Sequence, residues 1–209
     1  MNLQELIPAS QKKIFIYGEP ASGKTTFTLQ YAINYLKQGN KVIFIDTERS
    51  LSIERFNQLT NNNYKLLDNL LVYYADNFHL QRQFVKNLAN ITKSDNIKLI
   101  IIDTVGNHYR RFYSKNKEMA VTLMKHQLKL LNKLSKNIQI ILTNQTYKDL
   151  NGNVKSVGGF LFNGWAKYMI QLKKDPRKMI FEKPSKEILY FDIKEEGILI
   201  KDLTSMNAF

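Results

Sequence analysis

The chain has 209 residues, with 31 lysines and arginines against 18 aspartates and glutamates, and it has no cysteine. This length suits one α/β domain with a substantial core and is short for two ordinary domains and a linker, so we expect a single domain over residues 1–209. The absence of cysteine excludes disulfides and thiolate metal sites. Residues 1–11 have no signal-peptide pattern and no apolar run could span a bilayer, so we expect a cytoplasmic protein without a membrane partner.

The formal net charge of +13 is large for a chain of this size. Such an excess points to a polyanion as partner, with nucleic acid first. A bland alternative stays open, because many of the lysines are scattered singly and a lysine-rich surface can serve solubility alone. Where the charge gathers in the fold decides between the two.

The amino-terminal segment, residues 1–13, contains Pro8 and is expected to pack on the edge of the core without forming a domain. An apolar strand follows at Ile14 to Tyr17, and after it comes GEPASGKTT, which matches every required position of G-x-x-x-x-G-K-[ST]. In this motif the backbone N–H groups and the following helix cradle phosphates. We therefore expect ATP and Mg²⁺ as ligands, and a chance glycine-rich turn is the alternative. The expected nucleotide-binding residues are Gly18, Glu19, Pro20, Ala21, Ser22, Gly23, Lys24, Thr25 and Thr26.

Within that loop, Lys24 is expected to reach the β- and γ-phosphates, and the Thr25 hydroxyl is expected to ligate Mg²⁺. The helix from Thr26 to Leu36 stops near Gly39, and the buried strand KVIFID leads to Glu48. A short helix over Ser52 to Leu59, a strand over Leu70 to Tyr74 and a crossover helix over His79 to Ile91 follow. The next strand, LIIID, ends in Asp103, whose carboxylate is expected to orient Mg²⁺ through water.

The second half of the chain predicts two polar loops, two helices and several strands. Asn107 to Lys117 is predicted to be a basic connection, and Glu118 to Lys136 a long amphipathic helix. A strand over Gln139 to Leu142 delivers Gln145 to the edge that holds Lys24 and Asp103. The other predicted elements are a polar loop over Thr146 to Gly159, a helix over Leu161 to Lys167, and strands at Tyr168 to Leu172, Lys178 to Glu182, Ile188 to Ile193 and Ile198 to Ile200.

These elements predict an α/β P-loop NTPase with a mostly parallel sheet and C-terminal antiparallel β-hairpins. The ordered set GEPASGKTT, VIFIDTE, LIIIDT and ILTNQ, followed by the Gly158-Gly159 turn, resembles the core ATPase of the RecA/RadA recombinases. The resemblance implies a three-layer, RecA-like P-loop NTPase core. GGFLFNGWAKYMIQLKK, RKMIFEKP and YFDIKEEGI resemble the archaeal RadB family, the short paralogues of RadA that consist of the core domain alone. The resemblance covers most of Lys13 to Leu203.

The resemblance implies catalytic roles for three residues. Glu48 aligns with the glutamate that activates the attacking water, Gln145 with the glutamine that senses the γ-phosphate, and Lys24 with the phosphate-loop lysine. For Glu48 a helix cap or surface acid is the alternative, and for Gln145 an ordinary polar residue at a strand end.

The two polar loops resemble the DNA-binding loops of the family, and a solvated connection is the alternative for the first. The expected DNA-binding residues are Arg110, Arg111, Tyr113, Lys115, Lys117, Lys148 and Lys155. The first loop combines arginines with tyrosines, which suits backbone contacts and base stacking.

The chain departs from RadA in two respects. Residues 1–13 contain neither the helical DNA-binding domain of RadA nor a Phe-x-x-Ala polymerisation hook, and the second loop is short for strand exchange. The resemblance therefore implies an accessory protein that binds ATP and DNA, either single-stranded or branched, and hydrolyses ATP slowly. The protein partner that it implies is the RadA recombinase or a Holliday-junction resolvase. Two alternatives remain: a DNA-stimulated ATPase that forms filaments or rings, and a small-molecule kinase, for which no arginine-rich lid is evident.

Overall fold

The computed structural model describes residues 3–93, 96–148 and 154–201, except for the side chains of Gln4 and Lys148. The helices are α1 (Leu3–Leu6), α2 (Lys24–Lys37), α3 (Ile53–Thr60), α4 (Phe78–Ile91), α5 (Asn107–Tyr113), α6 (Lys117–Leu134), α7 (Gly159–Trp165) and a 3-10 helix at Tyr64–Asn69. The strands are β1 (Lys13–Gly18), β2 (Lys41–Asp46), β3 (Leu70–Tyr74), β4 (Ile97–Asp103), β5 (Gln139–Lys148), β6 (Val154–Ser156), β7 (Tyr168–Lys173), β8 (Lys178–Lys183), β9 (Glu187–Lys194) and β10 (Gly197–Ile200).

The described strands form one sheet in the order β10-β9-β8-β7-β1-β5-β4-β2-β3, with β6 pairing to β5 off this path. The strands from β3 to β7 in this order run parallel, and β7, β8, β9 and β10 are antiparallel neighbours. Parallel strands share one carboxyl edge, and in open α/β sheets that edge is where ligands bind. The residues that follow β1, β2 and β4, and those late in β5, therefore meet at one edge.

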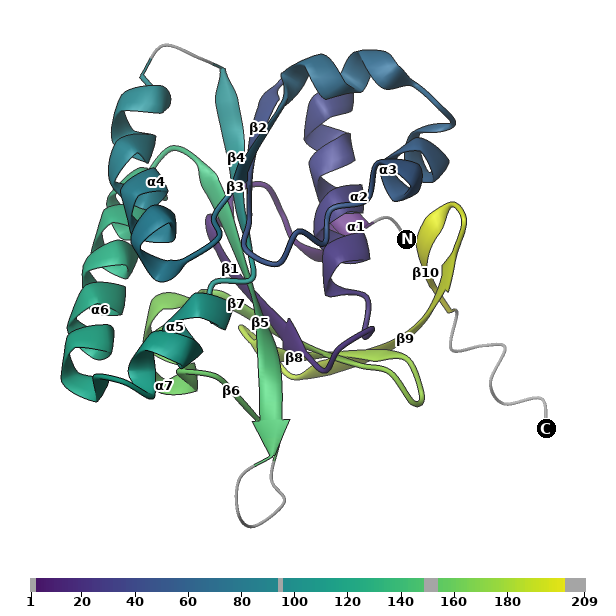
Figure 1. The fold of residues 1–209 in the computed structure, drawn as a ribbon. Coiled ribbons are helices and arrows are strands. Elements are labelled where there is room, and N and C mark those ends of the chain that lie inside the picture. Colours follow the sequence, from purple (N-terminus) through teal and green to yellow (C-terminus); the bar gives the residue numbers. More distant parts are fainter. Residues whose placement is uncertain (1–2, 94–95, 149–153, 202–209) are drawn as a thin grey trace.

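Helices cover both faces of the sheet (Figure 1), which is why the central strands are apolar throughout. On one face, α4, α5, α6 and α7 close a core that contains Phe15, Met124 and Phe162. On the other face, α1 and α2 close a second core that contains Phe27 and Tyr31. These are the three layers predicted from the sequence. Among the described residues, no helix has the length and apolar character needed to cross a membrane.

The C-terminal hairpin bends back over the helical layer beside α2 (Figure 1). The backbone N–H of Ile198 in β10 donates to Gln30 Oε1 at 2.7 Å, and Arg55 donates to the Lys194 and Glu195 carbonyls at 2.6 and 3.0 Å. These contacts fix the hairpin against α2 and α3, close to the start of α2.

The prediction of a loop over Asn107 to Lys117 is wrong, because this segment forms helix α5, a short turn and the first residue of α6. Val105, Tyr109, Phe112 and Tyr113 recur at helical spacing and pack inward, and the Phe112 ring lies 5.4 Å from that of Phe78. The polar and basic composition of the segment hid this apolar stripe.

Two further predictions need correction. The strand predicted over Gln139 to Leu142 continues to Lys148, and β6 pairs with its end, so the predicted loop from Thr146 to Gly159 includes strand residues on both sides of residues 149–153, which lie outside the described residues. Strand β7 forms the predicted antiparallel hairpin with β8. On its other side it pairs parallel with β1, because α7 provides a crossover that returns the chain in the same direction.

The core of the α7 face generates a stability prediction. Phe162 is fully buried, and its ring stacks on that of Phe15 with centroids 4.8 Å apart. Phe162→Ala is expected to lower the free energy of unfolding by about 3 to 5 kcal/mol, because it removes buried area and leaves a cavity. Phe160→Ala in the same helix is the control: this ring is 64% exposed, and its removal should cost less than about 0.5 kcal/mol. Equal changes in urea midpoint for the two variants would contradict the assigned packing of α7.

Candidate functional site

The loop between β1 and α2 has the backbone of an anion cradle. Ala21 and Gly23 have φ values of 59° and 102°, and these left-handed residues turn successive N–H groups to one side. At Gly18 the backbone approaches β7 so closely that an added Cβ would lie 2.3 Å from the Leu172 carbonyl oxygen. The two glycines of the motif are therefore required for different reasons. Gly18 leaves room for the close approach of the β7 backbone, and Gly23 adopts a left-handed backbone conformation.

Contacts from the turn between β7 and β8 hold this loop in place, which the sequence did not indicate. Arg177 Nη1 donates to the Ala21 carbonyl oxygen at 3.2 Å, and the backbone N–H of Lys174 donates to Glu19 Oε1 at the same distance. The loop is thus braced by a segment more than 150 positions later in the chain.

Lys24 folds over the loop from the first turn of α2. Its ammonium donates to the carbonyl oxygens of Gly18 at 3.0 Å and Glu19 at 2.8 Å. Burial lowers the pKa of Lys24, and the nearby carboxylates of Asp103 and Glu48 act in the opposite direction. The ammonium is therefore held at the centre of the cradle by neutral partners.

Asp103 ends β4 directly beside the loop, and its carboxylate joins three elements. Thr25 Oγ1 of α2 donates to Asp103 Oδ2 at 2.7 Å, and Thr143 Oγ1 of β5 donates to Oδ1. Complete burial raises the pKa of Asp103, while the two hydroxyl donors and Lys24 oppose that rise. A carboxylate and a threonine hydroxyl, both hard oxygen donors, thus lie together at the foot of the loop.

Glu48 and Gln145 face each other at the same edge. Gln145 Nε2 donates to both carboxylate oxygens of Glu48, at 2.9 and 3.1 Å, and Thr104 Oγ1 donates to Glu48 Oε1 at 2.9 Å. In the parallel pairing of β1 with β5, Gln145 lies opposite Gly18. The structure thus brings together the three residues predicted to be catalytic, although Glu48 and Gln145 are 97 positions apart.

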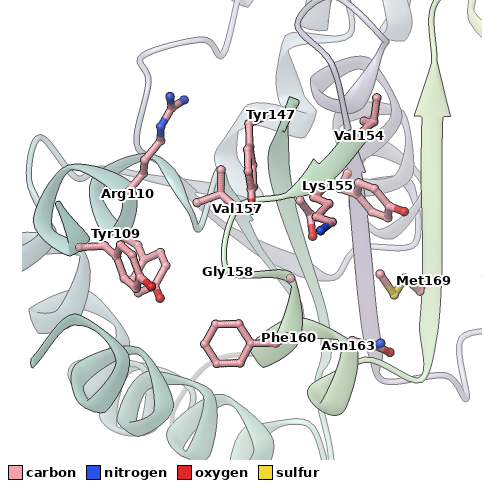
Figure 2. Close-up of a pocket in the computed structure, with 14 residues that line it drawn as sticks. Tyr109, Arg110, Tyr147, Val154, Lys155, Val157, Gly158, Phe160, Asn163 and Met169 are labelled. Carbon is pink, nitrogen blue, oxygen red and sulfur yellow. The ribbon is translucent and has the colours of Figure 1, made fainter. Parts of the chain in front are cut away.

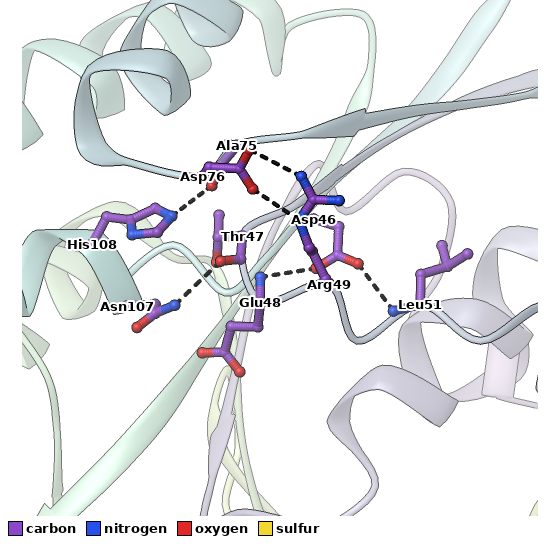
Figure 3. Close-up of polar contacts among 9 residues, drawn as sticks. All are labelled: Asp46, Thr47, Glu48, Arg49, Leu51, Ala75, Asp76, Asn107 and His108. Carbon is purple, nitrogen blue, oxygen red and sulfur yellow. Dashed lines mark hydrogen bonds and ion pairs between the residues drawn. The ribbon is translucent and has the colours of Figure 1, made fainter.

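The turn after β2 fixes the position of Glu48 (Figure 3). The carboxylate of Asp46 accepts from the backbone N–H groups of Glu48 at 3.0 Å and Leu51 at 2.9 Å. Thr47 Oγ1 donates to the Thr104 carbonyl oxygen at 2.8 Å and accepts from the Thr104 N–H at 3.0 Å. The Glu48 carboxylate consequently points away from the neighbouring ion pair of Arg49 and Asp76.

A cavity of about 750 Å³ links this edge to α5. Glu48 and Gln145 line it on one side, and Arg110, Arg111 and Ser114 line it from α5. The arginines predicted to contact DNA therefore share one cavity with the predicted catalytic pair, a proximity that the sequence did not reveal.

A second cavity, of about 680 Å³, lies between α5, the β5–β6 hairpin and α7 (Figure 2). Arg110 and Lys155 supply cations, and Tyr113 lies in its wall. Sequence reasoning did not assign to a site its other aromatic residues, Tyr17, Tyr109, Tyr147 and Phe160. Tyr109 is recoverable from the helical apolar spacing of α5, whereas Tyr147 and Phe160 stand in segments that carry no periodic signal.

The remaining predicted DNA-binding residues lie at or beyond the rim of these cavities. The Lys117 ammonium lies 5.9 Å from the centroid of the Tyr113 ring. Lys115 is exposed in the turn between α5 and α6. Lys148 ends β5, and its side chain lies outside the described part of the chain. Arg110 is the one predicted cation that lines both cavities.

Comparisons with known proteins agree with this geometry. The sequence model of the Rad51 family matches residues 10–198. The DNA repair and recombination protein RadB of Methanocaldococcus jannaschii is 39% identical over 199 residues, covering 90% of this chain and 92% of that protein. RadB of Methanococcus maripaludis strain C7 is 34% identical, and the alignment covers 95% of this chain and 97% of that protein.

A solved structure gives the same assignment. The crystal structure of the RadB recombinase aligns with a TM-score of 0.78 at 27% sequence identity, covering 94% of this chain and 95% of that one. The mixed sheet, parallel at its centre and antiparallel at its C-terminal strands, is thus shared with a solved member of the group. The chain therefore belongs to the Rad51 family, with a RecA-like ATPase fold, and within that family to the RadB group of DNA repair and recombination proteins.

Proposed function

We propose that the chain is a DNA-binding ATPase of slow turnover that acts as an accessory factor in DNA recombination and repair. The observation that carries this proposal is the hydrogen bonding between Gln145 and both oxygens of Glu48, in a cavity whose other wall holds Arg110 and Arg111. The similarity to RadB proteins of DNA repair and recombination supports the same function. A DNA partner also fits the cytoplasmic location expected from the sequence.

The loop between β1 and α2 fits the phosphates of a nucleoside triphosphate. Ser22 Oγ is buried and has no hydrogen-bond partner among the described residues, and the N-cap of α2, Gly23, offers no side chain to the first N–H groups of that helix. A phosphate supplies the oxygen acceptors that these donors lack. The Lys24 ammonium donates hydrogen bonds to two backbone carbonyl oxygens, and a bound phosphate would give it a charged partner.

Thr25 and Asp103 fit Mg²⁺, as the hydroxyl and the water-mediated carboxylate contact that the motif requires. Bound there, Mg²⁺ supplies neutralisation of the charge that develops on the phosphates. Residues 3–93, 96–148 and 154–201 contain no group of three or more His, Cys, Asp or Glu side chains placed to hold a metal ion. The other ligands would be phosphate oxygens and water.

The proposal of slow hydrolysis rests on the hydrogen bonds that the Glu48 carboxylate already accepts. Three hydrogen bonds from Thr104 and Gln145 engage its oxygens, so an attacking water must compete with them for the same acceptors. A γ-phosphate beside Gly18 offers the Gln145 amide an alternative, more strongly charged acceptor. Glu48 is available as a base only when the Gln145 side chain leaves it for the phosphate, so this side-chain movement limits turnover and also signals nucleotide binding to the rest of β5.

Single-stranded DNA fits the surface formed by α5 and the β5–β6 hairpin. Cations and exposed aromatic rings occur together there: Arg110 and Lys155 on one hand, Tyr147 and Phe160 on the other. This combination suits phosphate contacts and base stacking, which single strands require. Arg110 also lines the cavity of Glu48 and Gln145, so the proposed single-strand site and the proposed ATPase site have this residue in common.

A steady-state assay of ATP turnover with and without single-stranded DNA tests the proposal as a whole. The expected result is slow release of phosphate whose rate changes when DNA is added. Rapid turnover that rises with protein concentration and DNA would favour a filament-forming ATPase. Transfer of the phosphate to a small acceptor instead of water would favour a kinase. The RadA recombinase or a Holliday-junction resolvase, implied by the family resemblance, is the protein partner to test by co-purification.

Lys24→Ala is expected to abolish nucleotide binding, because it removes the side-chain cation at the centre of the cradle. Titration with a fluorescent ATP analogue in the presence of Mg²⁺ measures the loss. Lys37→Ala, at the exposed far end of the same helix, is the control and should bind normally. Binding of the Lys24 variant at wild-type affinity would refute the assignment of the loop.

Glu48→Gln is expected to leave ATP affinity nearly unchanged and to lower turnover by roughly 10²- to 10⁴-fold, because the amide keeps the shape but cannot accept the proton of water. Release of labelled phosphate from ATP measures turnover, and analogue titration measures affinity. Asp68→Asn, an exposed acid changed in the same way, is the control. Turnover equal to wild type would make Glu48 a structural acid.

Arg110→Ala combined with Arg111→Ala is expected to weaken single-stranded DNA binding and to flatten the slope of log K against log salt by roughly 1 to 2 units, because each phosphate contact contributes about 0.7 on single strands. ATP affinity should be retained. Lys65→Ala combined with Lys186→Ala makes the same change in net charge at exposed positions elsewhere. If the two double variants bind equally well, α5 is not the DNA surface.

A further inference from the structure

The outward face of α6 carries a row of lysines that the ATP and single-strand sites do not use. Lys125, Lys129 and Lys133 follow one another at intervals of four, and Lys136 stands just beyond the helix on the same side. All four are exposed, opposite the buried side of α6 that includes Met124 and Leu131. We refer to these four lysines as the α6 ridge. Figure 1 shows α6 beside α4 at the outside of its layer, where nothing in the described chain covers it.

No acidic residue balances the ridge along its own segment. Helix α6 carries one acid, Glu118 in its first turn, two turns before Lys125. From Met119 to Lys148 the sequence contains no aspartate or glutamate, and neither does the sequence of α4. Like charges four residues apart on a helix repel each other and destabilise it. A face that keeps three such lysines in register, without local acids, is complementary to a polyanion.

The ridge continues into a second cluster at the amino-terminal edge of the sheet. Lys13 Nζ donates to Asn132 Oδ1 of α6 at 2.9 Å, and the N–H of Lys167 donates to the Lys13 carbonyl oxygen at 2.9 Å. Partial burial and the nearby ammonium of Lys167 both lower the pKa of Lys13. The two lysines therefore lie close enough to repel each other, next to the C-terminal end of the ridge.

We infer that the α6 ridge, together with Lys13 and Lys167, binds the phosphate backbone of duplex DNA, at a surface separate from the one formed by α5 and the β5–β6 hairpin. Lys125 to Lys133 extend about 12 Å along the helix, a length that covers roughly three to four phosphates of one strand of a duplex. The rigid helix fixes the spacing of these cations in advance.

The absence of exposed Phe, Tyr and Trp side chains from the described part of α6 favours duplex over single-stranded DNA. Among the described residues, the only large apolar side chain that α6 exposes is Met119, at the end of the helix away from the ridge. Without stacking platforms a surface has little hold on unpaired bases. In a duplex the bases are inside, and phosphate contacts suffice to position a protein.

The location of the ridge gives it a distinct role from that of α5. Helix α6 begins next to α5 and runs back toward the amino-terminal edge of the sheet, so its last turns lie at the edge opposite the phosphate loop. A single strand at α5 and a duplex at the ridge would then occupy different surfaces at the same time.

The test compares two triple variants with the same change in net charge. In the ridge variant, Lys125, Lys129 and Lys133 are each changed to alanine; in the control, Lys37, Lys65 and Lys186, which are also exposed, are changed instead. Binding of each intact protein to a blunt duplex oligonucleotide is measured across a salt series. The ridge variant should lose at least tenfold in duplex affinity, and its salt slope should flatten by about 2 to 3 units, at about 0.9 per contact.

The single-strand affinity of the ridge variant should match that of the control, and the double variant Arg110→Ala, Arg111→Ala should keep the duplex salt slope. If the ridge variant binds duplex DNA as well as the control does, the inference about the ridge fails, while the proposed single-strand site is unaffected. Equal duplex binding by the ridge and control variants would overturn the inference and leave net charge as the cause.

Loss of binding to vesicles of phosphatidylserine and phosphatidylcholine, with duplex binding unchanged, would overturn it in favour of a lipid surface. A thermal melt by circular dichroism establishes that α6 remains folded in each variant.

Discussion

The carboxylate of Asp103 holds the centre of the candidate site together. It accepts hydrogen bonds from Thr25 at the start of α2 and from Thr143 in β5, and it stands at the end of β4. One buried anion thereby fixes the phosphate loop relative to two strands. Burial of an unpartnered carboxylate is costly, so each of these donors stabilises the arrangement as well as orienting it. The loop geometry depends on this contact. Gln145 lies further along β5, one of the elements that Asp103 joins, and Glu48 follows β2, which pairs with β4.

The Glu48 and Gln145 side chains extend this arrangement from the phosphate loop toward α5. Gln145 contacts Glu48 on one side and lies opposite Gly18 on the other, while the arginines of α5 line the cavity beyond them. A change in the hydrogen-bond partner of the Gln145 amide therefore alters both the Glu48 carboxylate and the strand that leads into the β5–β6 hairpin. In the proposed function, the two sites are coupled through this contact, without a long path through the core.

The distribution of charge separates two kinds of cationic surface on one chain. At α5 and β6 the cations are mixed with exposed aromatic rings, whereas along α6 they stand alone. Both surfaces are suited to phosphates, but only the first offers stacking to unpaired bases. The net charge of +13 alone does not distinguish these two surfaces.

The sequence by itself determined the phosphate loop, the order of the parallel strands along the chain, the acids that follow β2 and β4, and the family. These features are local: an apolar run, a glycine spacing and a carboxylate at a strand end are each visible within about ten residues. It mistook α5 for a loop, because the polar and basic residues around them obscure the apolar positions Tyr109, Phe112 and Tyr113. Only the tertiary structure decided that Gln145 hydrogen-bonds Glu48, that Arg177 supports Ala21, and that lysines spread from Lys13 to Lys167 gather beside α6. The physical reason is that contacts between residues far apart in the chain depend on strand register and on helix packing across the sheet, which no local pattern encodes.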